Sequence, residues 1–170
     1  MLGAPMKAAR VGGTFDSESK TAIAHTMNAM SADGSDFEIL ADREAVALLA
    51  TVPVGRMVYS DRAMPSVVPV VFIFDGVDIV IRTGRRSRLA TLAPGNIVAF
   101  EVDDISMASR SGWTVVVTGR VELVDDPAEV ERLSALRLQT WLPSPTDCYL
   151  RLRPELIAGR RIPQPAAASA

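Results

Sequence analysis

The sequence has few of the side chains on which metal sites, disulfides and covalent catalysis depend. It contains one cysteine, Cys148, and one histidine, His25. An internal disulfide is therefore excluded, and a haem held by histidine within a folded domain is not expected. The sequence also lacks a metal-ligand cluster, a nucleophile elbow and a Walker loop. Nothing in it is typical of a metalloenzyme, a serine hydrolase or a P-loop nucleotidase.

Long apolar runs and an excess of one charge are missing as well. The longest apolar run, Val67 to Phe74, is too short to cross a bilayer as a helix. The first ten residues, MLGAPMKAAR, lack the apolar core of a secretory signal. With 18 Lys and Arg against 20 Asp and Glu, the net charge of −2 favours neither nucleic acid nor an anionic membrane as a partner. We expect a cytoplasmic protein, which also fits the single cysteine.

The composition that is present is that of an ordinary globular chain. At 170 residues, with 48% hydrophobic and 22% charged residues, it is long enough for one domain with a real core. Residues 1–35 are rich in small and polar residues and predict an extension that is flexible or weakly docked. Residues 36–162 form the predicted domain, and residues 163–170 a disordered tail.

The chain is organised around a predicted hairpin. A long apolar strand, Pro65 to Phe74, is followed by Asp75-Gly76 and a second strand, Val77 to Thr83. Asp-Gly between two β-branched runs is a strong hairpin signal, because glycine accepts the positive φ that such a turn needs. Pro69 in the middle of the first strand removes a ladder donor, so an edge, a bulge or a bend is expected there. Such a place could present backbone groups to a planar heterocycle, or it could be a barrel corner with no ligand.

A basic loop follows the hairpin. The segment Arg82-Thr83-Gly84-Arg85-Arg86-Ser87-Arg88 brings four arginines, two hydroxyls and the predicted start of a short helix at Ser87 into one stretch. These are the donors that a phosphate needs. The residues by themselves allow two interpretations, a site for a phosphorylated cofactor or an arginine-rich solvated turn.

The remaining pattern predicts a mainly β protein, an antiparallel barrel or curled sheet with short helical connections. Besides the short helix at Ser87, two helices are predicted, one with Asp42 as N-cap and one that begins with Asp126-Pro127-Ala128-Glu129 and runs to about Leu138. The predicted strands besides the hairpin are Arg56–Ser60, Asn96–Val102, Gly112–Asp125 with a bulge or corner at Gly119, Cys148–Leu152 and Leu156–Ile162, with a polar connection over Asp103–Ser111.

Several short segments occur in a joint order and spacing that is more specific than any one of them. They are Val54-Gly55-Arg56, Pro65–Phe74, Ile81-Arg82-Thr83, Ser87-Arg88-Leu89, Val98–Asp103, Gly112–Val115 and Gly159–Ile162. With this order, the region from Phe37 to Ile162 resembles the pyridoxamine 5′-phosphate oxidase-like superfamily, the FMN-binding split barrels. It looks most like the small actinobacterial branch of that family. The resemblance implies an antiparallel split β-barrel that forms a homodimer, with two cofactor sites in the clefts between subunits.

The resemblance also implies roles for individual residues. The flavin phosphate would bind Arg82, Thr83, Ser87 and Arg88, and the backbone of Val68, Pro69 and Val70 would meet the pyrimidine edge of the ring. Trp113 lies where the family has a residue close to the flavin, and Trp141 with Arg160 or Arg161 would approach from the partner chain. One departure stands out: relatives commonly have Gly-Ser-Lys where this chain has Arg86-Ser87-Arg88. Arginine can still pair with phosphate, but it is bulkier than lysine.

Each of these residues also has a plain structural interpretation. Trp113 and Trp141 could be core or interface aromatics. Arg160 and Arg161 could be an exposed pair on an edge strand that discourages aggregation. Cys148, in an apolar strand, is expected to be a buried structural thiol.

The resemblance implies an FMN-dependent oxidoreductase that acts on a small-molecule substrate or electron donor. The flavin would carry the redox chemistry, so the lack of an evident acid or base is expected. Two alternatives stay open. One is a reductase that uses deazaflavin, whose longer acidic tail would recruit Arg85 and Arg86. The other is a non-enzymatic flavin-binding or sensor module. Pyridoxamine 5′-phosphate oxidase activity itself would need a second phosphate site, which the sequence does not reveal.

Overall fold

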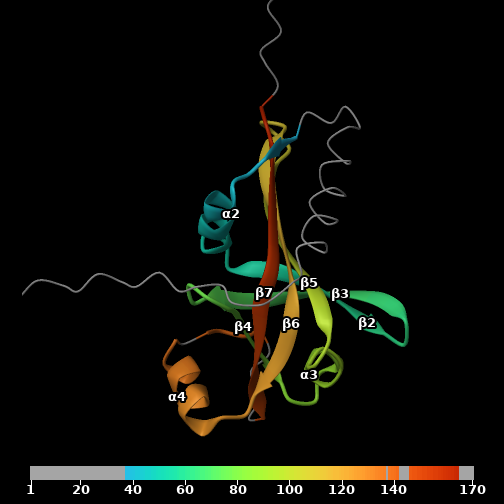
Figure 1. Cartoon of the computed structure of the whole chain (residues 1–170), viewed down its shortest axis with the longest axis vertical. Coiled ribbons are helices and arrows are strands. Elements are labelled where there is room, and N and C mark those ends of the chain that lie inside the picture. The colour runs from blue at the N-terminus through green and yellow to red at the C-terminus, as the bar shows by residue number, and fades with distance from the viewer. Residues whose placement is uncertain (1–36, 137, 142–145, 165–170) are drawn as a thin grey trace, which may run out of the picture.

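The computed structural model describes residues 37–136, 138–141 and 146–164 (Figure 1). The predicted extension over residues 1–35 and positions 165–170 of the predicted tail lie outside the described residues. In chain order the elements are β1 (Glu38–Ile39), α2 (Asp42–Leu49), β2 (Val54–Asp61), β3 (Met64–Phe74), β4 (Ile79–Gly84), α3 (Arg88–Leu92), β5 (Ile97–Ser106), β6 (Ser111–Val124), α4 (Pro127–Ala135) and β7 (Asp147–Ile162).

The described strands form one antiparallel sheet that closes on itself. Their order is β1-β7-β4-β3-β2-β5-β6, and β6 pairs again with β7. Closure pairs most of the strand edges, but the short strand β1, which pairs with the end of β7, and the part of β3 before Phe72 each have a partner on one side only. Strands β6 and β7 run together over most of their length and form the long axis of the molecule in Figure 1. The predicted mainly β, antiparallel barrel is confirmed.

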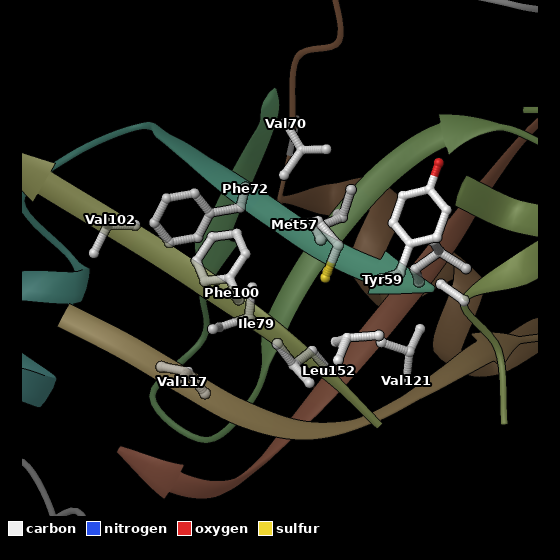
Figure 2. Packing of buried hydrophobic residues seen from close by; sticks show 14 of the residues in the cluster. Met57, Tyr59, Val70, Phe72, Ile79, Phe100, Val102, Val117, Val121 and Leu152 are labelled. Atoms are coloured by element: carbon white, nitrogen blue, oxygen red, sulfur yellow. The ribbon is translucent and has the colours of Figure 1, made fainter. Parts of the chain in front are cut away.

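The barrel interior is filled by side chains that alternate along the strands. Phe100 and Met57 are fully buried, and the rings of Phe72 and Phe100 meet edge to face with centroids 4.8 Å apart (Figure 2). Helix α2 adds Ala45 and Leu49 to this cluster. A second, smaller cluster lies on the outer face of β4 and β7, where α4 contributes Leu133. The barrel is thus filled by side chains of its strands together with those of α2, and α4 covers one patch of its outer face.

Strand β7 is continuous, whereas the sequence predicted two strands separated near Pro154. The register of β6 and β7 shifts at Gly119: Thr118 pairs with Leu156 and Gly119 with Pro154, so Glu155 is an extra residue in β7. The bulge or corner that we predicted at Gly119 is confirmed. A proline is tolerated opposite such an irregularity, because regular ladder bonding is already interrupted there.

Local signals at two of the predicted helix starts, Asp126 and Asp42, had different outcomes. Asp126 caps α4 as predicted, and its carboxylate accepts a hydrogen bond of 2.9 Å from the Glu129 amide. Asp42, predicted as an N-cap, is instead the first residue of α2, and the cap is Ala41, which provides no side-chain hydrogen bond. The Asp42 prediction was therefore wrong by one residue. An acidic side chain in the first turn still interacts favourably with the helix dipole.

The β3–β4 turn is fixed by the side chain of Asp75. One carboxylate oxygen accepts hydrogen bonds from the Val77 and Asp78 amides at 3.1 and 2.9 Å, and the other lies 3.0 Å from an Arg132 guanidinium nitrogen of α4. Gly76 has a φ of 95°, as the predicted turn requires. Burial alone would raise the pKa of Asp75, but these hydrogen bonds and Arg132 outweigh it and hold the pKa below its ordinary value.

We predict that Asp75→Asn lowers the free energy of unfolding at pH 7 by about 1.5–3 kcal/mol, the range for a hydrogen bond to a charged group. A carboxylate with a lowered pKa stabilises the fold above its unfolded pKa of about 3.9, and this stabilisation is lost as the pH falls through the folded pKa. The difference between wild type and variant should therefore shrink below about pH 4. Urea unfolding at pH 7 and at acid pH measures it. Asp104→Asn, at an exposed position of β5, is the matched control and should have little effect. A loss that is independent of pH would contradict the electrostatic explanation.

Candidate functional site

A groove of about 540 Å³ runs between the first part of β3 and the loop that connects β4 to α3. Its size is in the range of small-molecule and cofactor sites. Seven of the eleven residues that we predicted for a flavin site lie in it: Val68, Pro69, Val70, Thr83, Ser87, Arg88 and Trp141. The other residues along its walls are Tyr59, Ser66, Val67, Val71, Gly84, Leu89 and Thr140.

One wall of the groove is a stretch of β3 that has a partner strand on one side only. Strand β2 pairs with β3 from Met64 to Val71, whereas β4 pairs with it only from Phe72 to Phe74. The amide of Phe72 points toward β2, where it donates to Pro53. Because backbone groups alternate along a strand, the nitrogen of Pro69 faces the opposite side, toward the unpaired stretch. The register of β2 and β3 is unbroken, so Pro69 marks an edge and not a bulge.

The opposite end of the groove carries two hydroxyls that position each other. Ser87 Oγ accepts hydrogen bonds from Thr83 Oγ1 at 3.1 Å and from the Ala90 amide at 3.0 Å. The second bond caps α3, a helix of only five residues. A serine hydroxyl that accepts two hydrogen bonds retains its own proton as a donor. Ser87 can therefore donate to an acceptor in the groove.

The four arginines of the loop do not act together. Arg82 Nε lies 3.0 Å from Asp147, a nearly buried carboxylate, and its Nη1 reaches the Leu138 carbonyl at 3.4 Å. Arg85 pairs with Asp125 at 3.6 Å, and Arg86 is exposed. Arg88, which forms an ion pair with Asp61 of β2, is the one member of the four that lines the groove.

Tyr59 closes the inner side of the groove and was not identified from the sequence. It is buried, and Figure 2 shows its ring at the edge of the core with the hydroxyl directed away from Leu152 and Val121. The alternation of β2 was the available signal: Met57, Tyr59 and Asp61 share the inward face of the strand. Ser66 of β3 was also not identified from the sequence. The alternation of β3 was the available signal, because its even positions face inward.

Four of the predicted residues lie outside this groove, namely Arg82, which pairs with Asp147, and three others. Trp113 is partly buried against the barrel core, and Arg161, its partner in the β6–β7 register, forms ion pairs with Glu44 and Glu38. Arg160 pairs in register with Thr114 and with Ile39 of β1. Their assignment to a cofactor stays a prediction. Trp141, which we predicted to approach from the partner chain, lines the groove of its own chain with 58% of its surface exposed.

The thiol of Cys148 lies behind the groove and is buried, as predicted. Its Sγ lies 3.4 Å from the Thr83 carbonyl, across the β4–β7 pairing. Burial raises the pKa of this thiol, which keeps it in its unreactive form. Cys148 thus supports the strand that carries Thr83 and is not a candidate nucleophile.

Within the part of the chain that the structure describes, no group of three or more His, Cys, Asp or Glu side chains is arranged to hold a metal ion. No described helix is long and apolar enough to cross a membrane. The groove is thus the strongest candidate site, and its polar groups are suited to an anion at one end of a largely apolar molecule.

Comparison with known proteins identifies relatives over most of the chain. A family model described as pyridoxamine 5′-phosphate oxidase matches residues 41–161. The uncharacterised protein Rv0080 of Mycobacterium tuberculosis is 35% identical over 124 residues, which are 70% of this chain and 81% of that protein. A Corynebacterium glutamicum structure, provisionally assigned as a pyridoxamine 5′-phosphate oxidase, is 30% identical with a TM-score of 0.65 over 76% of this chain and 96% of its own.

A third relative is the FAD binding protein of Mycobacterium smegmatis. It is 28% identical to this chain, with a TM-score of 0.59, and the match covers 75% of this chain and 99% of that structure. The order of strands in the barrel and these matches confirm the predicted split-barrel fold. The chain belongs to the pyridoxamine 5′-phosphate oxidase family.

Proposed function

We propose that the groove binds flavin mononucleotide and that the protein is a flavin-dependent oxidoreductase acting on a small molecule. The observation that carries the proposal is the pairing of two features in one groove. Hydroxyl and guanidinium donors stand at one end, and an unpaired strand edge with apolar side chains forms the wall beside them. The relative from Mycobacterium smegmatis, which binds FAD, supports a flavin as the class of cofactor.

The residues of the groove fit the two parts of this cofactor. Thr83, Ser87 and Arg88 would hold the phosphate, because hydroxyls and a guanidinium are its usual protein donors. The backbone of Val68, Pro69 and Val70 would meet the ring edge, with Trp141 as an apolar wall. When bound, a flavin supplies hydride and electron transfer through its ring. The chain's own residues then bind and orient it, which agrees with the small number of titratable side chains along the groove, Tyr59 and Arg88.

FMN is favoured over deazaflavin by the position of Arg85. The longer acidic tail of a deazaflavin would recruit Arg85 and Arg86, but neither lines the groove, and Arg85 pairs with Asp125. Oxidation of pyridoxamine 5′-phosphate is not favoured either. That substrate would bring a second phosphate, and the described groove has one arginine along its walls.

The proposal includes a homodimer. Trp113, Arg160 and Arg161 lie outside the groove of their own chain. A second copy would bring such residues to the cofactor, so the complete site would be formed by two chains. Sedimentation analysis of the purified protein tests this part. A monomer at micromolar concentration that still binds flavin tightly would remove the second chain from the proposal.

The central experiment is to purify the chain, record its visible spectrum and identify any released cofactor by mass. We expect about one flavin per chain, and reconstitution of any apo-protein by FMN. Reduction of the bound flavin by a nicotinamide donor, followed by reoxidation by an added acceptor, would separate an oxidoreductase from a flavin-binding sensor. If the released molecule is FAD or a deazaflavin, that molecule and not FMN is the cofactor. A colourless protein that binds none of the three would refute the proposal.

A further inference from the structure

We propose that Asp61 is a built-in competitor for the phosphate, whose carboxylate occupies Arg88 until the ligand displaces it. The inference rests on the proposed function and concerns the regulation of that same groove. It makes Asp61 a determinant of affinity and of the charge that a ligand must carry.

The first support is the position of the carboxylate. Asp61 is the last residue of β2 and shares the inward face of that strand with Tyr59, which lines the groove. Its Oδ2 pairs with Nη2 of Arg88. Asp61 does not itself line the groove, but the ion pair places its negative charge beside Arg88, the one charged residue among the described residues of the groove walls.

The second support is the unequal freedom of the two partners. The side chain of Asp61 is 18% exposed, whereas that of Arg88 is 69% exposed. Asp61 is fixed by its pairing with Met64 across a tight turn, in which Arg62 and Ala63 have φ values of 52° and 64°. Arg88 is the first residue of α3, and most of its side chain is exposed. We therefore expect the guanidinium to move and the carboxylate to stay in place.

Charge explains the consequence. A bound phosphate monoester carries up to two negative charges, against one on the carboxylate, and can accept two hydrogen bonds from a guanidinium in a fork. It would therefore take Arg88 from Asp61, but the remaining carboxylate would still repel it across a short distance. Asp61 thereby weakens the binding of every anionic ligand. It favours those ligands that carry enough negative charge to displace it from Arg88. A ligand without a negative charge is unaffected.

The test uses the full-length protein, with flavins removed, as wild type, Asp61→Asn and Asp125→Asn. Asp125→Asn is the matched control, because it removes the same charge from an arginine of the same loop, Arg85, outside the groove. Asp61→Asn should lower the Kd of FMN about three- to tenfold. The change is larger than the effect of an exposed ion pair alone, because the carboxylate of Asp61 also repels the phosphate. Riboflavin, which lacks the phosphate, should bind all three proteins equally. In an Arg88→Gln background, Asp61→Asn should still tighten FMN but by a smaller factor, because the competition for Arg88 is gone and only the repulsion between carboxylate and phosphate is left.

Weaker or unchanged FMN binding by Asp61→Asn would overturn the inference. Weaker binding would mean that Asp61 positions Arg88 for the phosphate, and unchanged binding would mean that Asp61 does not compete with it. If wild type binds no flavin, the flavin proposal fails, and inorganic phosphate becomes the probe. A larger phosphate-dependent rise in melting temperature for Asp61→Asn than for wild type and Asp125→Asn would then keep the inference, and equal rises would overturn it. Asp61→Ser replaces Asp61→Asn in the same measurements if the asparagine variant does not fold.

Discussion

Gly119→Ala should lower the free energy of unfolding by about 3 kcal/mol, at the upper end of the cost of overpacking. A methyl group on Gly119 would lie 1.9 Å from the Arg153 carbonyl oxygen and 2.9 Å from its carbonyl carbon. These are backbone atoms of β7 at the point where its register with β6 shifts. They cannot move away without disturbing the β6–β7 pairing, which closes the barrel.

Gly76→Ala provides the comparison. A methyl group there would meet nothing within 4 Å, but Gly76 has a φ of 95°, so alanine costs only the backbone strain of about 1 kcal/mol. Urea unfolding followed by tryptophan fluorescence measures both variants. We expect Gly119→Ala to be clearly less stable than Gly76→Ala. Equal losses would show that the close approach at Gly119 relaxes without cost.

Features that depend on a few neighbouring residues could be predicted from the sequence. One to four adjacent residues determine each of three features: the Asp75-Gly76 turn, the Asp126 cap and the irregularity at Gly119. Their physical causes are local: a positive φ, a side-chain acceptor for an amide, and the lack of a side chain. The general barrel followed from the number of such strands and turns and from the resemblance to a known family.

Features that depend on distant pairing could not be predicted in the same way. Strand β1 has two residues, too few for a periodic pattern, and exists because it pairs with Arg160 and Arg161 of β7. Strand β5 continues to Ser106, where the sequence suggested a polar connection, because β6 pairs with it as far as Ser111. In both cases the partner strand, and not the local propensity, decides the conformation.

The same limit applies to the arginine-rich loop. The sequence shows four arginines close to two hydroxyls, but it does not show which carboxylates each arginine will meet. Arg82 meets Asp147 and Arg85 meets Asp125, residues far along the chain. Asp61 could not be recognised as the partner of Arg88 until β2 and α3 were placed together. A cluster of like charges in a sequence therefore overstates the number of groups that one site can use.

Arg88→Ala should weaken FMN binding by about 1.5–3 kcal/mol, the range for a hydrogen bond to a charged group, or roughly 10- to 150-fold in Kd. The loss has two causes. The variant lacks the one guanidinium of the loop that lines the groove, and it leaves the carboxylate of Asp61 without that partner. Both effects act on the phosphate, so the affinity for riboflavin should change little.

Arg85→Ala is the matched control, because Arg85 belongs to the same loop but pairs with Asp125 outside the groove. Titrations of FMN and riboflavin against wild type and both variants, at one fixed salt concentration, give the comparison. If Arg85→Ala weakens FMN as much as Arg88→Ala does, the loop acts through its overall charge and the phosphate has no defined partner. If only Arg88→Ala does so, and only toward FMN, the phosphate lies beside Ser87, Thr83 and Arg88. The ring must then extend along β3, since the groove continues there from the loop.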